Sequence, residues 1–411
     1  MAGDGVHMEL DRTVGRTPSV LDLFAAPGGL SQGFKDAGYR VVAVVDNDRW
    51  GCETLKHNFY LDGTEVIQSN LEKLSVKGRV DVVIGGPPCQ SFSLVGRPKI
   101  NHLRTHKNKR GVYRASFIDD DRNRLYSCFV KTVNALRPQF FVMENVPGMV
   151  SFEGGQIKDQ VLEDFKKIGY GTNVEFLNSA DYGVPQVRKR TIFIGNRIGV
   201  SNPFPKKTHF DPFKDLQTTL DQCTNVMRPY QTVRDAISDL PPLESGEGQD
   251  ETNYLSASDL TSYQRWSREG SSKLYNHVAR QHSERDRKLF KMLKPGGKMI
   301  DLPENLRPYK SDKFRDKIKK QRWDRPSSVI LAHMQKDGLM YVHPDNDQAR
   351  SFTPREAARV QSFRDSYRFM GPMTQQFRQI GNAVPPLLAQ AIALAIKPYL
   401  KPLKHPWCTI G

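Results

Sequence analysis

One cysteine stands where a rigid turn would hold it. Cys89 follows the apolar run 81–84 and the Gly-Gly-Pro-Pro turn 85–88. The run predicts a short buried strand, and the glycines and prolines predict that it ends in a fixed turn. A lone cysteine is most often a packing residue, but packing alone needs no such turn. We therefore expect a thiol at the carboxyl end of a strand, where α/β sheets bind their ligands.

A carboxylate and two arginines stand beside other predicted strands. Glu144 follows the apolar run 139–143, while Arg188 and Arg190 precede the run 191–195. A solvated strand-end glutamate and a basic edge strand are the common alternatives. Because alternate residues of an extended segment share a face, both arginines can point to the same site. Two strand ends would then bring a thiol and a carboxylate to one edge of the sheet.

The first part of the chain supplies the elements that must position these groups. Strand 19–24, the small-residue turn 25–29 and a helix to about Ala37 predict the start of a nucleotide-binding α/β unit. Strand 41–45 then ends at Asp46, where an acid can accept hydrogen bonds from ribose hydroxyls. Asp46 or Asp48 could instead cap the following helix. The pattern Gly-x-Gly-x-x-Gly is absent, which argues against a dehydrogenase.

The charge distribution predicts a polyanionic partner. The 411 residues carry a formal net charge of +16. Residues 97–114 hold seven Lys/Arg and no acid, and residues 280–325 hold sixteen Lys/Arg against seven Asp/Glu. Charge concentrated in two segments indicates binding surfaces rather than general solubility, although solvated charged faces remain the alternative for 280–325.

Cysteine usage and hydropathy indicate the compartment. The chain has five cysteines without Cys-x-x-Cys spacing, so neither a zinc site nor a disulfide framework is expected. No signal peptide and no apolar run of membrane-spanning length is apparent. We expect a reducing compartment, which would be the cytoplasm or, if the source is eukaryotic, the nucleus. We expect no membrane association.

Six stretches in a fixed order resemble the motifs of the cytosine-C5 DNA methyltransferases. Together they extend over roughly residues 19–400, which makes a chance match negligible. They are the turn 25–30, Pro87-Pro88-Cys89-Gln90, Glu144-Asn145-Val146, Gln186 to Arg190, 352–363 and Gln379 to Pro386.

The resemblance implies an α/β fold with a Rossmann-like, S-adenosylmethionine-dependent methyltransferase sheet and a smaller, irregular target recognition domain. We expect an N-terminal arm (1–18), a catalytic and cofactor-binding domain (19–199), a target recognition domain (200–350) and C-terminal helices that return to the catalytic domain (351–411).

The resemblance also assigns the chemistry. Cys89 would add to C6 of cytosine, with Arg188 or Arg190 favouring its thiolate. Glu144 would stabilise the charge at N3, and an arginine, with Arg188 preferred, would hold O2. The base would be flipped out of double-stranded DNA. The residue that removes the C5 proton is not identified.

S-adenosylmethionine is the cofactor that the resemblance implies. Ala26 stands where the family commonly has glycine, and Asn70 stands where it usually has aspartate. The expected cofactor-binding residues are Phe24, Ala26, Gly28, Gly29, Leu30, Asp46, Asn47, Asn70, Pro87, Asn382 and Val384.

The expected activity is that of a DNA (cytosine-5-)-methyltransferase, acting as a monomer on a specific duplex sequence, as in restriction-modification. A tRNA cytosine-C5 methyltransferase of the same fold is an alternative, disfavoured because no Cys-Phe-Thr string is present. The second alternative is a DNA-binding relative of the same family that has no catalytic activity.

Overall fold

The computed structural model describes residues 6–9, 17–88, 124–151, 155–213, 227–308 and 316–401. Cys89 and the basic segment 97–114 lie outside the described residues.

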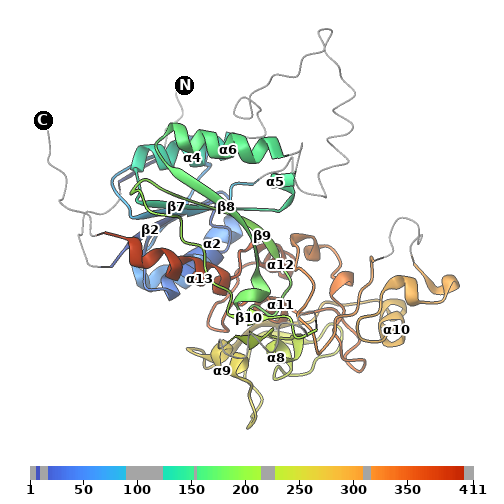
Figure 1. Cartoon of the computed structure of the whole chain (residues 1–411). Helices are drawn as coiled ribbons and strands as arrows, with labels where there is room; N and C mark the ends of the chain where they lie inside the picture. The colour runs from blue at the N-terminus through green and yellow to red at the C-terminus, as the bar shows by residue number, and fades with distance from the viewer. Residues whose placement is uncertain are drawn as a thin grey trace, which may run out of the picture.

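A seven-stranded sheet forms the centre of the larger lobe (Figure 1). The strand order is β4-β3-β2-β6-β7-β9-β8; β4, β3, β2, β6 and β7 run parallel, and β9 is antiparallel to β7 and β8. This mixed sheet confirms the expected α/β fold. The strands are β2 (Ser19–Leu23), β3 (Arg40–Asp46), β4 (Glu65–Gln68), β6 (Val82–Gly85), β7 (Phe140–Asn145), β8 (Gly171–Asn178) and β9 (Lys189–Asn196).

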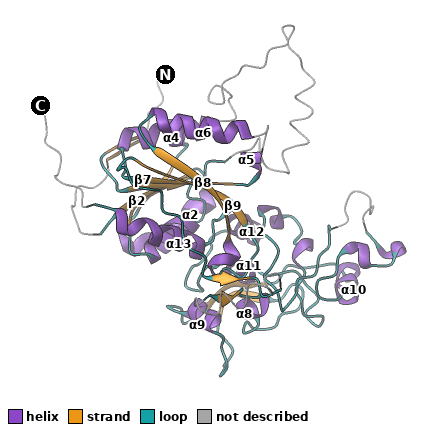
Figure 2. Ribbon diagram, viewed as in Figure 1, coloured by secondary structure: helices purple, strands orange, loops and turns teal. Residues whose placement is uncertain are grey.

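Alternate side chains of each central strand enter two separate cores. In β2, Val20 packs on the face that carries α1 (Gly29–Asp36), α2 (Arg49–Phe59) and α13 (Pro386–Ile396). Leu21 and Leu23 pack on the opposite face, which carries α4 (Arg124–Leu136) and α6 (Gln156–Lys167). A sheet covered on both faces explains why its strands read as apolar runs. Figure 2 shows these helical layers above and below the strands.

The order of the strands fixes where the site must lie. β2 lies between β3 and β6. The connection that leaves the carboxyl end of β2 therefore runs to one side of the sheet, and the connection that leaves the carboxyl end of β6 runs to the other side. Such a reversal opens a crevice at that edge of the sheet. The turn 25–29 follows β2 and the turn toward Cys89 follows β6, so both predicted motifs meet at this crevice.

The second lobe consists mainly of loops and short elements, and it lies beside the carboxyl end of the sheet (Figure 1). A small separate core includes Leu289, Phe290 and Val342. The other α-helices and strands of the described residues are β1 (Val6–Glu9), β5 (Leu74–Lys77), α5 (Gly148–Ser151), β10 (His209–Phe210), β11 (Arg228–Pro229), α8 (Val233–Ile237), β12 (Gly248–Thr252), α9 (Ser262–Arg268), β13 (Leu274–Val278), α10 (Glu284–Met292), α11 (Pro354–Val360) and α12 (Met373–Asn382).

The fully buried helix α11 joins the two lobes. Thr353 and Glu356 form a capping box, with Pro354 in the first turn. Buried charges tie the helix to its surroundings: Arg350 pairs with Glu356 at 2.7 Å, and Arg359 pairs with Asp365 at 2.6 Å. Because such pairs cost desolvation, they specify one arrangement more than they add stability.

The stretch Met373–Tyr399 is apolar and long enough to resemble a membrane span. However, 67% of that window is buried inside the protein, and the chain leaves the helix between α12 and α13. This burial is typical of core helices.

Candidate active site

Glu144 and Arg190 form an ion pair at the edge of the sheet. Arg190 Nε lies 2.7 Å from Glu144 Oε1, and the side chains are only 10% and 14% exposed. The strand register explains the pairing. Glu144 of β7 lies opposite Ile192 of β9, so Arg190 is its diagonal neighbour on the same face.

The loop that leads to Cys89 lies against this pair. A Cβ added to Gly86 would lie 3.0 Å from Glu144 Oε2, so the loop passes close to this carboxylate and a side chain at position 86 would require it to shift slightly. Asn145 Nδ2 also donates to the Pro87 carbonyl at 3.2 Å. The structure therefore brings the residues just before Cys89 to the predicted carboxylate, while Cys89 itself lies outside the described residues.

Arg188 does not accompany Arg190 to Glu144. Its guanidinium is buried and donates to the backbone carbonyls of Ile330 at 2.6 Å, Gly381 at 3.0 Å and Ala383 at 2.9 Å. Of the two arginines, it is therefore Arg190, and not the preferred Arg188, that contacts the predicted carboxylate. Sequence spacing allowed both to share a face, but the carbonyls that attract Arg188 belong to distant segments.

The turn after β2 has an unusual backbone. Gly28 adopts a left-handed conformation with φ 89°, and its N–H donates to the Ala25 carbonyl at 2.8 Å. Phe24 and Ala26 also have positive φ values, 61° and 50°. An L-residue in this region is strained, which is the physical reason that glycine would suit position 26.

Asp46 and Asp48 bind different backbone groups, and only Asp48 caps a helix. Asp48 caps α2, because its side chain accepts from the Gly51 N–H at 2.8 Å. Asp46 holds the turn, accepting from the N–H groups of Ala26 and Asp48, each at 2.8 Å. Burial raises the pKa of the Asp46 carboxyl above its ordinary value. With two N–H groups bound, the carboxylate retains lone pairs for further donors.

The other predicted cofactor residues differ in exposure. Asn47 and Asn382 are exposed and Phe24 is half-buried, so these side chains are accessible to a ligand. Leu30 is buried in the core. Asn70 is exposed, and its Oδ1 accepts from the Glu72 N–H at 3.1 Å, so it already caps a short helical turn.

The C-terminal segment closes onto the turn after β2. A Cβ on Gly29 would lie 2.0 Å from the Val384 carbonyl oxygen, so the two backbones touch. The Tyr367 hydroxyl donates to the Pro27 carbonyl from the other side. Residues more than 300 positions apart thus contact each other at this turn.

Asp22 is a buried acid below this turn that had not been singled out from the sequence. Its Oδ2 accepts hydrogen bonds from the Ser31 N–H and hydroxyl, and its Oδ1 has no partner. Burial, with a smaller contribution from the Asp46 charge, raises the pKa of Asp22 to about 7. The sequence does carry a signal for Asp22, because an acidic residue stands among the apolar residues of a predicted strand.

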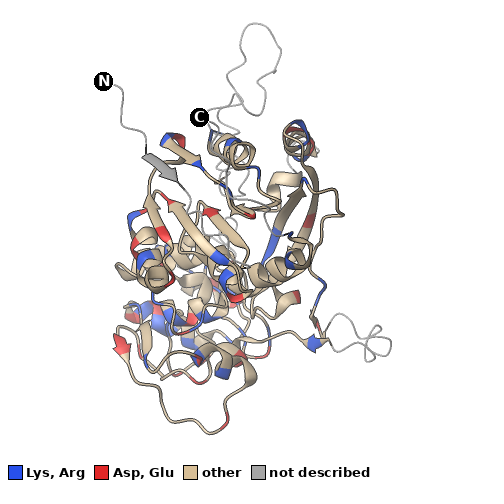
Figure 3. Cartoon of the chain, turned by 90° about the vertical axis from the view of Figure 1, so that its left-hand side faces the viewer, with Lys and Arg blue, Asp and Glu red and all other residues tan. Residues whose placement is uncertain are grey.

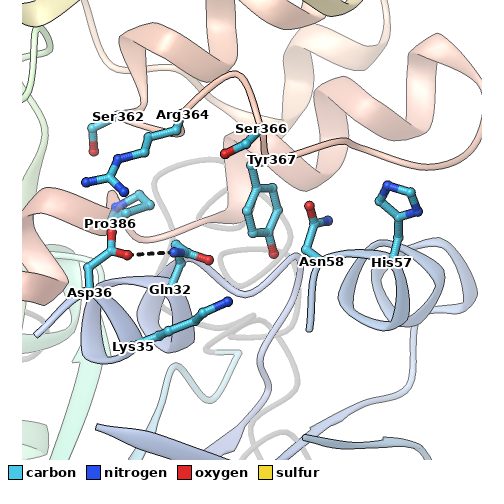
Figure 4. Close-up of a pocket in the computed structure, with 10 residues that line it drawn as sticks. All are labelled: Gln32, Lys35, Asp36, His57, Asn58, Ser362, Arg364, Ser366, Tyr367 and Pro386. Atoms are coloured by element: carbon cyan, nitrogen blue, oxygen red, sulfur yellow. Dashed lines mark hydrogen bonds between the residues drawn. The ribbon is translucent and has the colours of Figure 1, made fainter. Parts of the chain in front are cut away.

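A pocket of about 320 Å³ lies outside this arrangement. It is bounded by α1, the end of α2 and the loop 362–367, and Tyr367 lines its wall (Figure 4). Its cations already have acidic partners, since Lys35 pairs with Asp62 and Arg364 with Glu269. The pocket contains none of the predicted site residues.

Lys and Arg are interspersed with acidic residues on the described part of the chain (Figure 3). In the basic segment 280–325, Lys288 pairs with Glu284 at 2.8 Å and Arg322 with Asp324 at 2.8 Å. Lys291 and Lys294 are exposed. Part of the positive charge of this segment is thus already neutralised.

The mixed sheet, with a small-residue turn and an acidic residue at its crevice, is typical of the α/β methyltransferase class. The model of the C-5 cytosine-specific DNA methylase family matches residues 19–398. The chain therefore belongs to this family and is a DNA cytosine-5 methyltransferase.

Curated bacterial relatives match most of the chain. Type II methyltransferase M.Bpa9945I of Bacillus paralicheniformis is 33% identical over 92% of this chain and 98% of its own length. Type II methyltransferase M1.HphI of Haemophilus parahaemolyticus is 36% identical over 92% and 86%, and M.DdeI of Desulfomicrobium norvegicum is 36% identical over 93% and 89%.

Solved structures share the fold. A chain described as a DNA modification methyltransferase encoded within an E. coli prophage has a TM-score of 0.67 at 24% identity and covers 93% of this chain and 99% of its own. A mutant DNMT2 of Spodoptera frugiperda has a TM-score of 0.51 at 17% identity, with the same coverage.

Proposed function

We propose that this chain methylates C5 of a flipped-out cytosine in a specific double-stranded DNA sequence, with S-adenosylmethionine as methyl donor and Cys89 as covalent nucleophile. The observation that carries the proposal is the Glu144–Arg190 pair, packed against Gly86 in the loop that leads to Cys89. The named type II relatives support a role as the methyltransferase of a restriction-modification system.

Cys89 supplies the nucleophile. Cytosine C5 is a weak nucleophile, and addition of a thiolate at C6 converts C5 into an enamine-like carbon. The positive charge of Arg190 at this edge would favour the thiolate form. After transfer, loss of the C5 proton and elimination would restore the aromatic ring and release Cys89.

Glu144 and Arg190 stabilise the charge that develops as C6 is attacked. Glu144, carrying or sharing a proton with N3, would meet the charge at that nitrogen, and Arg190 would meet it at O2. Their ion pair holds both groups before substrate binds, so little reorganisation is required during the reaction.

The residues present fit S-adenosylmethionine. At Gly28 and Gly29 the space that a side chain would take is filled by Tyr367 and by the Val384 carbonyl oxygen, so the two glycines let the turn after β2 pack closely on these segments. Asp46 would accept the ribose hydroxyls, with Phe24, Asn47 and Asn382 accessible around it. When bound, this cofactor supplies an electrophilic methyl group on a sulfonium.

DNA recognition is assigned to the second lobe. The irregular region 200–350 would read the target sequence, and the basic segments would contact phosphates, which position the protein without specifying bases. Because a stacked cytosine is inaccessible, the base must leave the duplex. We further propose a monomer that acts in the cytoplasm, as a bacterial restriction-modification enzyme would.

Transfer of a tritiated methyl group distinguishes the candidate substrates. The purified chain is incubated with labelled S-adenosylmethionine and either duplex DNA or tRNA, and bisulfite sequencing then locates the product. The proposal predicts labelled C5 in one short DNA sequence. Label in tRNA alone, or in neither nucleic acid, would contradict it.

A further inference from the structure

Arg188 is a buried cation that binds backbone rather than carboxylate. It is 1% exposed, and among the described residues it donates to three carbonyl oxygens and forms no ion pair. Its Nε has no hydrogen-bond partner, and burial lowers its pKa. Burying a charge is costly, so these charge-assisted hydrogen bonds must offset much of that cost.

Two of the three carbonyls lie where a helix ends. Gly381 is near the end of α12, and Ala383 is the residue that follows it. The last carbonyls of a helix have no partner within the helix, and a cation there also complements the helix dipole. Arg188 therefore fixes the way in which the chain leaves α12.

The turn that Arg188 fixes is also the one that touches the proposed cofactor loop. Asn382 lies between the two bound carbonyls and is exposed. Val384 comes directly after Ala383, and its carbonyl oxygen contacts Gly29. A change in the path of 381–384 would therefore move both predicted cofactor residues of this segment.

Two glutamines complete the same connection. Gln361 Nε2 also donates to the Ala383 carbonyl, at 2.6 Å, and the Gln186 amide donates to Gln361 Oε1. Gln186 Oε1 accepts from the Ile330 N–H at 2.8 Å. The segment before β9 thus holds the C-terminal turn through Gln186 as well as through Arg188.

We propose that Arg188 is a positioning residue for the cofactor site, with Gln361 as its second support, and that it takes no part in stabilising the reacting base. The inference rests on the proposed S-adenosylmethionine site. It divides the two neighbouring arginines by function: Arg188 sets cofactor affinity through the turn 381–384, and Arg190 acts at Glu144.

Calorimetric titration of the full chain with S-adenosylmethionine tests the division. Arg188→Lys retains the charge but loses the planar fork, and we expect its Kd to rise about tenfold, the equivalent of about 1.4 kcal/mol. Gln361→Leu is the milder variant, expected to raise Kd about threefold. Arg190→Lys is the matched control, expected to bind S-adenosylmethionine as the unsubstituted chain does.

Steady-state kinetics provide the second readout. Arg188→Lys should raise the KM for S-adenosylmethionine while kcat at saturating cofactor stays within about twofold, and Arg190→Lys should lower kcat. Unchanged Kd and KM in Arg188→Lys and Gln361→Leu would overturn the inference, even if their melting temperatures fall. Failure of the unsubstituted chain to bind would instead overturn the proposed cofactor and, with it, the inference.

Discussion

Arg190 Nε lies 2.7 Å from Glu144 Oε1, in a place where both side chains are largely shielded from water. The two residues come from antiparallel neighbours, β7 and β9, whose register fixes their distance. Such a pair holds a carboxylate in one orientation before any substrate arrives. It also leaves Glu144 Oε2 facing Gly86 in the loop toward Cys89.

Glu144→Gln should lower kcat about 10²- to 10³-fold, because a preorganised group that stabilises developing charge contributes about that much. The substitution retains the shape of the side chain but removes its negative charge and its ability to take up or release a proton. The measurement is single-turnover methyl transfer to duplex DNA.

Glu163→Gln on the exposed surface of α6 is the matched control for this change. It should transfer methyl groups at the unsubstituted rate. A Glu144→Gln protein with normal kcat would show that the carboxylate only supports the structure.

Ala26→Gly should stabilise the fold by a net of about 0.5–1 kcal/mol. Ala26 has φ 50°, and removal of its Cβ relieves a left-handed strain of about 1–2 kcal/mol, partly offset by the greater freedom of glycine in the unfolded chain. Urea unfolding measures the change.

Ala25→Gly in the same turn is the matched control. Ala25 is buried and has no positive φ, so this substitution should lower the free energy of unfolding. Equal effects of the two substitutions would contradict the strain at position 26.

Three buried histidines should make the fold sensitive to acid. Burial lowers the pKa of His343 to about 3 and of His282 to about 4, and it also lowers the pKa of His277. The unfolded chain therefore binds more protons below about pH 6.5, and stability is lost as the pH falls from there toward the folded pKa values. Asp22, with its raised pKa, acts in the opposite direction between about pH 4 and 7.

Substitution of His343 isolates the contribution of this histidine to the loss of stability in acid. The free energy of unfolding lost between pH 7.5 and 5.5 should be smaller by about 1 kcal/mol in His343→Gln than in the unsubstituted chain. His333→Gln, at an exposed position, is the control. The same loss in all three proteins would exclude His343 as a source of acid sensitivity.

The basic segment 97–114 should govern the salt dependence of DNA binding. If Lys107, Lys109 and Arg110 meet phosphates, their joint replacement by alanine should flatten the slope of log affinity against log salt by up to about 0.9 per lost contact. The methylated sequence should stay the same, because phosphate contacts do not specify bases.

Lys56→Ala is the control, since Lys56 is exposed on α2 and paired with Glu53 at 3.3 Å. An unchanged slope in the triple variant would mean that the segment does not contact the backbone. A changed target sequence would mean that it reads bases.

Local patterns in the sequence predict much of this fold. Apolar runs predict five strands of the central sheet, β2, β3, β6, β7 and β9, since a strand covered on both faces must be apolar throughout. Thr353 and Asp48 can be recognised as helix N-caps from the sequence alone. Each side chain accepts a hydrogen bond from the backbone N–H only three residues further along the chain. By contrast, β8 is an edge strand with many exposed positions, and it lacks the apolar run that would reveal it.

The choice between the arginines could not be made locally. Arg188 and Arg190 are equivalent by type and spacing, and they differ only in what distant segments offer. Arg188 meets carbonyls 142 to 195 residues away, whereas Arg190 meets Glu144 across a strand pair. Sequence spacing limits which side chains can share a site, but tertiary contacts decide which ones do.

Covalent trapping of the protein on DNA tests whether Cys89 is the nucleophile. A duplex that carries 5-fluorocytosine at the methylated position, incubated with S-adenosylmethionine, blocks the loss of the C5 substituent and should leave the protein attached to DNA. If Cys89 is the nucleophile, the unsubstituted chain should form a denaturant-stable adduct, and Cys89→Ser should form none while still binding DNA. An adduct with Cys89→Ser, or methyl transfer by that protein at the normal rate, would contradict Cys89 as the nucleophile.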